Sequence, residues 1–136
     1  MEAFSLIADL GFSIAAVIGG GVFIILLFLK QFIFDFILQT KSMILYKGIY
    51  GHWCGIKHSL HHGLATILIL ILFNIQSAIM VGILEFIVHY HIDWVKVKFG
   101  SKDISTDRFW LEFGLDQFAH SITYLIIVMY IVRYLT

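Results

Sequence analysis

Four long apolar stretches constrain what this 136-residue chain can fold into, and they lie at residues 14–38, 57–74, 76–97 and 109–133. A helix needs about 20 predominantly apolar residues to cross the hydrocarbon core of a bilayer. The chain is 60% hydrophobic and only 13% charged, whereas soluble domains carry roughly 25% charged residues. We therefore expect one all-α domain, an integral membrane four-helix bundle whose surroundings are a lipid bilayer.

The first apolar stretch contains three consecutive glycines, Gly19 to Gly21, and two interpretations of them remain open. Glycine weakens a helix by roughly 1 kcal/mol relative to alanine, so residues 3–17 could form a separate interfacial helix. Alternatively, the glycines allow membrane helices to pack closely. The segment before them carries Glu2 and Asp9 and lacks a basic region, which argues against a cleaved signal peptide.

Basic residues indicate an orientation in the membrane. Seven of the nine lysines and arginines lie in or beside the first and third loops, namely Lys41, Lys47, Lys57, Lys96, Lys98, Lys102 and Arg108. The positive-inside rule places these loops in the cytoplasm and both termini outside, which predicts a bacterial cytoplasmic (inner) membrane. Nine acidic residues balance the basic ones, so no nucleic-acid partner is expected, and homo-oligomerisation is left open. The lone Cys54 excludes an intrachain disulfide.

Histidine and aspartate recur four residues apart in each of the last three stretches. The pairs are His58 with His62, His89 with Asp93, and Asp116 with His120. Residues four apart share a helix face, and counting from the outer ends of the helices places the three pairs at a similar depth. Asp35 adds a carboxylate in the first stretch. Ionisable groups inside a membrane span usually mark function.

This set of side chains suits a divalent transition metal. Imidazole favours zinc or iron and carboxylate admits manganese, and a helical bundle can hold one or two ions between facing helices. We expect zinc, with manganese or iron as alternatives. The expected ligands are Asp35, His58, His62, His89, Asp93, Asp116 and His120. A hydrogen-bonded proton relay and polar packing are the other interpretations of this cluster.

Further polar residues flank the expected ligands. Glu85 lies four residues before His89, and either Asp35 or Glu85 could act as a general base. The candidates for substrate binding are Lys41, Lys47, Lys96, Gln39 and Gln117. The lysines would hold an anionic lipid or a phosphorylated substrate at the cytoplasmic leaflet. The histidines outside the shared register are not expected to be ligands.

Four segments, DFILQTKSMILYK, HSLHHG, HYHIDWVK and DQFAH, occur in an order that resembles an integral-membrane family of bacteria and their phages, domain of unknown function 3307. The resemblance covers about residues 31–125. The family pattern falls on Asp35 with Gln39, Lys41 or Lys47, His58 with His62, His89 with Asp93 and Lys96, and Asp116 with Gln117 and His120. It implies a site at these residues and names no reaction.

Together these features predict a metal-dependent hydrolase acting on a phosphoester or lipid-like substrate at the cytoplasmic leaflet. A bound metal ion would activate water for this reaction. The alternatives are a His/Asp proton relay or small ion or solute transporter, a di-iron redox enzyme, and an interaction protein whose polar core fixes packing. The outer halves of the last three stretches are almost wholly apolar, which favours a one-sided pocket over a transport path.

Overall fold

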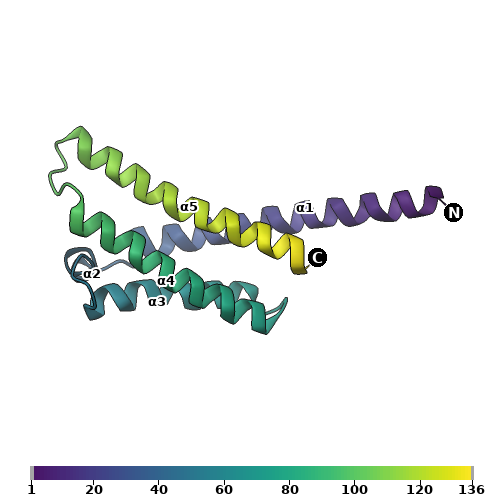
Figure 1. Ribbon diagram of the computed structural model, residues 1–136, viewed down its shortest axis with the longest axis horizontal. Helices are drawn as coiled ribbons and strands as arrows, with labels where there is room; N and C mark the ends of the chain where they lie inside the picture. The colour runs from purple at the N-terminus through teal and green to yellow at the C-terminus, as the bar shows by residue number, and fades with distance from the viewer. Residues whose placement is uncertain (1, 136) are drawn as a thin grey trace.

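The protein is described by a computed structural model that gives the backbone of residues 2–135 and the side chains of residues 17–133 (Figure 1). Its elements are α1 (Glu2–Phe32), the π-helical turn η1 (Ile33–Ile37), α2 (Lys41–Tyr46), α3 (Trp53–Leu70), α4 (Ile75–Phe99) and α5 (Asp107–Leu135). The described residues form helices and no strand, which confirms the all-α class.

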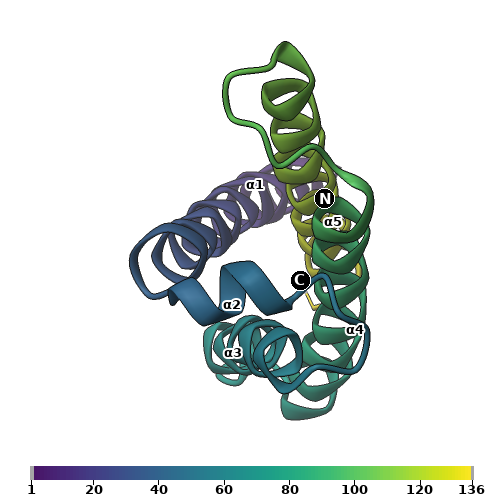
Figure 2. The same cartoon turned by 90° about the vertical axis from the view of Figure 1, so that its left-hand side faces the viewer.

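The four long helices are arranged in a ring, and each packs against two neighbours. Helix α1 contacts α3 and α5, and α4 contacts the same two helices. The short helix α2 lies across one end of the ring, which we call the α2 end (Figure 2). The first residues of α1 and the last of α5 point toward the opposite end (Figure 1). This is the up-and-down arrangement of a four-helix bundle.

Within the described part of the chain, three segments are long and apolar enough, by length and composition, to cross a membrane: Val17–Ile37, Ile75–Phe99 and Asp107–Arg133. They coincide closely with three of the four predicted spans. The fourth prediction falls on α3, where three histidines and Lys57 lower the apolar character. At 18 residues α3 would extend about 27 Å, which is close to the hydrocarbon thickness of a bilayer.

Helix α1 is continuous from Glu2 to Phe32, so no separate helix precedes the glycines. Gly20 supports the packing interpretation, because a Cβ atom there would lie 2.9 Å from the side chain of Val132 in α5. Gly19 and Gly21 face open space. Only the middle glycine therefore lets α1 and α5 approach.

Helices α3 and α4 form a hairpin that is closest at two glycines. A Cβ atom on Gly63 would lie 2.6 Å from the carbonyl oxygen of Gly82, and one on Gly82 would lie 2.7 Å from the carbonyl oxygen of Gly63. Asn74 ends the turn between the helices, since its side chain accepts a hydrogen bond from the N–H of Ser77 and caps α4. The close approach sets the spacing of the residues next to Gly63, including His62.

The two halves of the bundle have different interiors. Away from α2 the core is almost entirely apolar and consists of Phe23, Leu27, Leu70, Ala78, Val81, Tyr124, Ile127, Val128 and Ile131. Toward α2 the buried residues include histidines, aspartates and a lysine. Burial of the apolar side chains away from α2 stabilises the packing of the four long helices. The same packing encloses the polar side chains at the α2 end.

Candidate metal centre

Asp35 lies in the middle of the π-helical turn that ends the first long helix. The N–H of Leu38 donates to the carbonyl oxygen of Ile33 at 2.8 Å, which is the wide π-type spacing. Such turns occur frequently at functional sites. The Gln31 amide donates to Oδ2 of Asp35, and the Tyr124 hydroxyl donates to the Gln31 carbonyl oxygen. These contacts leave Oδ1 of Asp35 facing the histidines.

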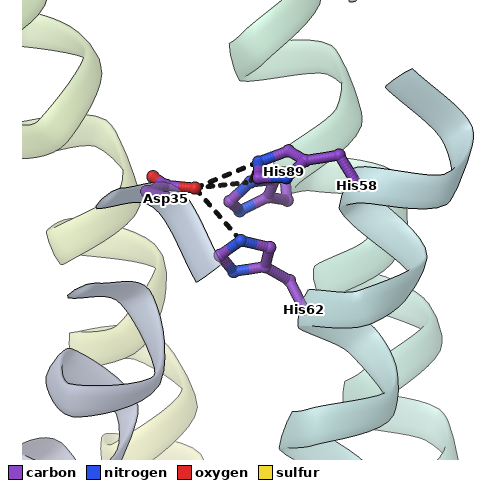
Figure 3. Close-up of side chains that lie close together, drawn as sticks. All are labelled: Asp35, His58, His62 and His89. Atoms are coloured by element: carbon purple, nitrogen blue, oxygen red, sulfur yellow. Dashed lines mark hydrogen bonds and ion pairs between the residues drawn. The ribbon is translucent and has the colours of Figure 1, made fainter. Parts of the chain in front are cut away.

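Three histidines from α3 and α4 point toward this carboxylate (Figure 3). Nε2 of His58 and Nε2 of His62 lie 3.0 and 3.1 Å from Oδ1 of Asp35, and Nε2 of His89 lies 3.9 Å from it. The histidine side chains are at most 1% exposed and that of Asp35 is 7% exposed. Their ligand atoms all lie within 4.8 Å of one another, so this group could hold a metal ion.

A second group, His89, Asp93 and His120, meets the same distance criterion and also could hold a metal ion. Oδ2 of Asp93 lies 3.4 Å from Nε2 of His89, while Oδ1 lies 3.7 Å from Nε2 of His120. Oδ1 of Asp116 lies 3.7 Å from the same nitrogen of His120. The structure therefore brings all seven predicted ligands into one buried cluster, which we call the His/Asp cluster.

Several ligand atoms in the cluster are buried and have no partner with hydrogen-bond geometry among the described residues, although Asp35 Oδ1 and His62 Nε2 lie 3.1 Å apart. They are Asp35 Oδ1, His62 Nε2, Asp93 Oδ2, Asp116 Oδ1 and His120 Nε2. An unsatisfied buried polar group costs roughly 1–3 kcal/mol. Two ligands that are each about 2.1 Å from a tetrahedral ion lie about 3.4 Å apart. The separations in the cluster are close to that value, so a cation would satisfy these atoms.

Lys47 adds a positive charge at the edge of the cluster. Its ammonium group donates to Oδ1 of Asp93 at 3.0 Å, and its side chain is 8% exposed. Burial by itself lowers the pKa of this ammonium, but the carboxylates of Asp93, Asp35 and Asp116 together outweigh that effect and raise the pKa above its usual value. Gly55 of α3 makes room for Lys47, because a Cβ atom there would lie 3.2 Å from the Lys47 Cα.

The other predicted substrate-binding residues have different environments. The amide nitrogen of Gln39 lies 3.1 Å from Nε2 of His58, and that of Gln117 donates to Oδ2 of Asp116 at 3.1 Å. The ammonium of Lys96 lies over the rings of Phe109 and Phe113. Lys41 is exposed at the start of α2. The two glutamines thus contact expected ligands.

A cavity of about 250 Å³ adjoins the cluster at the α2 end. Its polar lining consists of Asp35, Asp116, Lys47, Lys96, Gln39 and Gln117. A second cavity, of about 450 Å³, lies between α4 and α5 and shares Lys96 and Asp116 with the first. Its remaining wall includes Ile92, Val95 and Leu115. Arg108 and Glu112 also line the second cavity, so both cavities have polar and apolar walls.

Glu85 makes a buried polar contact that was not predicted from the sequence. It accepts hydrogen bonds from Lys30 of α1 and from Thr66 of α3, and all three side chains are buried. The signal was present in the sequence, since a lysine within an apolar span needs a buried partner of opposite charge. Glu85 as a general base stays a prediction, and in the structure its carboxylate is engaged by Lys30.

The family model described as protein of unknown function, DUF3307, matches residues 22–136. The chain belongs to this family. Comparison with curated proteins and with solved structures yields no match. The DUF3307 match begins within α1 and includes every residue of the His/Asp cluster. Because the family description states no activity, function has to be argued from the chemistry of the cluster.

Proposed function

We propose that this protein is a membrane-embedded, metal-dependent hydrolase that acts on a phosphoester of a lipid-like substrate at the cytoplasmic leaflet. The observation that carries the proposal is the convergence of unpartnered imidazole nitrogens and carboxylate oxygens beside a cavity lined by two lysines. Hydrogen bonding alone leaves these buried atoms unsatisfied, whereas a divalent cation would satisfy them.

The metal would be held first by Asp35, His58, His62 and His89. Three imidazoles and one carboxylate suit zinc best, and they also admit manganese or iron. When bound, a divalent ion supplies Lewis-acid chemistry: it polarises a phosphoryl oxygen and lowers the pKa of water toward ~7. The protein supplies the direction of the Asp35 carboxylate, through Gln31, and a buried setting.

The cavities support an anionic substrate with an apolar part. Lys47 and Lys96 both line the cavity beside the cluster. The ammonium of Lys96 lies over the rings of Phe109 and Phe113, and its positive charge would attract a phosphate group. The adjoining cavity between α4 and α5 has apolar side chains such as Ile92 and Val95 in its wall beside Arg108 and Glu112, and its apolar part would accept an acyl chain. This arrangement favours a lipid phosphoester over a wholly soluble one.

The apolar half of the bundle argues against a transport function. A path through the protein would need polar groups along its whole length. The core away from α2 is instead filled by residues such as Phe23, Leu27 and Ile131. Among the described residues, the polar interior therefore lies toward one end of the bundle.

The test is metal analysis and activity of the detergent-purified protein prepared without chelators. We expect stoichiometric zinc or manganese and hydrolysis of phosphatidic acid in mixed micelles, with slower turnover of a water-soluble phosphomonoester. His62→Ala should weaken metal binding by at least roughly 10–100-fold and abolish hydrolysis. His61→Ala is the matched control, because His61 is only partly buried and lies beside the Phe34 ring.

Two results would contradict the proposal. One is the absence of metal from the wild-type protein, and the other is equal metal content in His62→Ala and His61→Ala. Stoichiometric iron with visible absorption and no hydrolysis would favour the redox alternative instead.

A further inference from the structure

We propose that the His/Asp cluster holds two metal ions and that the Asp93 carboxylate bridges them. The inference rests on the proposed metal-dependent function and deepens it, because a two-ion centre defines how a phosphate group would be held. The first ion would take the Asp35, His58 and His62 side. The second would take the Asp116 and His120 side.

The cluster contains more ligands than a single ion uses. A tetrahedral zinc ion takes four ligands, and the group of Asp35, His58, His62 and His89 already provides that number. His120 and Asp116 come from α5, on the other side of Asp93, and neither belongs to that group. A single ion bound by that group would therefore leave His120 and Asp116 unused.

The two α5 residues, His120 and Asp116, are arranged like two ligands of one metal ion. Nε2 of His120 and Oδ1 of Asp116 are 3.7 Å apart, which is too long for a hydrogen bond. Neither atom has a hydrogen-bond partner among the residues that the structure describes, and the two side chains are 2% and 5% exposed. The other oxygen of Asp116 accepts from Gln117. That contact directs the free oxygen toward His120.

Asp93 lies between the two ligand sets and presents one oxygen to each. Its Oδ2 lies 3.2 Å from Nε2 of His58 and 3.4 Å from Nε2 of His89. Its Oδ1 lies 3.7 Å from Nε2 of His120. A carboxylate whose oxygens face two ligand sets can bind an ion through each, and His89 belongs to both of the groups that could hold a metal ion. Ions in two-metal hydrolytic sites lie about 3.5–4 Å apart.

Lys47 is compatible with this arrangement. Its ammonium contacts Oδ1 of Asp93 at 3.0 Å, and a carboxylate oxygen has a second lone pair for a metal. With neutral imidazoles, the three aspartates and Lys47 leave a net formal charge of minus two in the cluster. Two divalent ions would reverse this to plus two. A phosphate dianion would then neutralise the centre, which fits a phosphoester substrate.

The test is a metal titration of chelator-stripped full-length protein in detergent, using Mn²⁺ and Zn²⁺ alone. We expect two ions per chain in the wild type and in the His61→Ala control, and one ion in His120→Ala and in Asp116→Asn. Mn²⁺-loaded wild type should give the electron paramagnetic resonance signal of an exchange-coupled pair. His120→Ala should give that of isolated Mn²⁺.

The outcomes separate this inference from the proposed function. Saturation of the wild type at one ion, lost in His62→Ala and kept in His120→Ala, would overturn the two-ion centre and leave the hydrolase proposal standing. A wild type that binds no metal would overturn both. If His120→Ala fails to fold, the nearly isosteric Asp116→Asn decides: one ion supports the two-ion centre, and two ions contradict the role of Asp116 in it.

Discussion

Gln31 and Tyr124 decide which oxygen of Asp35 faces the histidines. The Gln31 amide occupies Oδ2, and the Tyr124 hydroxyl holds the other end of that amide in place. Tyr124 is almost fully buried, at 1% exposure, and belongs to α5, so the contact also ties α5 to α1. Groups that orient a metal ligand in this way commonly contribute to affinity as much as to geometry.

Tyr124→Phe therefore should weaken metal binding without unfolding the protein. The change deletes one hydroxyl from a well-packed ring and frees the Gln31 amide to rotate. We expect metal affinity to fall by roughly 10-fold, measured by competition with a chromophoric chelator. Tyr46→Phe, which removes a hydroxyl from an exposed ring stacked on His52, is the control. Equal affinities in the two variants would show that the Gln31 contact does not orient Asp35.

At this scale the clustering of the expected ligands was easier to predict from the sequence than the contacts that support them. The i, i+4 pairs place His58 and His62, for example, on one helix face by geometry alone. Gln31 and Tyr124 meet across 93 positions of the chain, and no local spacing predicts such a contact. The resemblance left Lys41 and Lys47 equivalent. Only the position of α2 distinguishes them, by bringing Lys47 to Asp93.

Among the elements, the α3–α4 hairpin sets the distance between the histidines of its two helices. The backbones approach at Gly63 and Gly82, where neither helix has room for a side chain. His62 directly precedes Gly63, and its ring stacks on that of His89 with centroids 3.7 Å apart. Small residues at helix contacts are the usual means of close approach in membranes.

Gly63→Ala should push the two helices apart. Its Cβ atom would lie 2.6 Å from the Gly82 carbonyl oxygen and 3.0 Å from the Phe86 Cβ, so backbone must move. Overpacking of this kind costs typically about 1–3 kcal/mol. We expect a lower Tm in detergent and weaker metal binding. Gly114→Ala in α5 is the control, because nothing lies within 4 Å of its added Cβ. A Gly63→Ala protein as stable as Gly114→Ala would contradict the close approach.

The two short elements, η1 and α2, were not predicted from the sequence. A span over 14–38 was expected, and the structure ends α1 at Phe32 and widens the next turn into η1. π-Helical turns are rare and occur mostly as single turns, frequently at functional sites, so helix propensity does not predict this one, which contains Asp35. Helix α2 did have a local signal: Thr40 caps it by accepting from the N–H of Met43. Threonine is a preferred N-cap residue.

For the whole molecule, the distribution of basic residues predicts that the α2 end faces the cytoplasm. The predicted helices and their order could be derived from hydropathy because each span must satisfy its own backbone in lipid. The relative rotation of the helices could not, since it depends on contacts such as Gly20 against Val132. The sidedness is the part of the arrangement that an experiment in cells addresses directly.

Single cysteines should reveal the orientation in intact bacterial cells. In a Cys54→Ser background, Leu72→Cys lies in the turn between α3 and α4 and is 90% exposed, and Ile104→Cys lies in the loop between α4 and α5 and is 67% exposed. A membrane-impermeant maleimide should label Leu72→Cys from outside. It should label Ile104→Cys only after permeabilisation. The reverse pattern would invert the orientation that the positive-inside rule predicts.

The division of the bundle into an apolar and a polar half has an electrical consequence. Membrane voltage drops across the low-dielectric part of the bilayer, and moving one charge through 100 mV costs about 2.3 kcal/mol. The apolar core lies in the half away from α2, while the cavity beside Asp35 and Lys47 lies at the α2 end. An ion or phosphate arriving from that end would cross little of the voltage drop. The centre would therefore operate equally in energised and de-energised membranes, and the apolar half would act as its insulator.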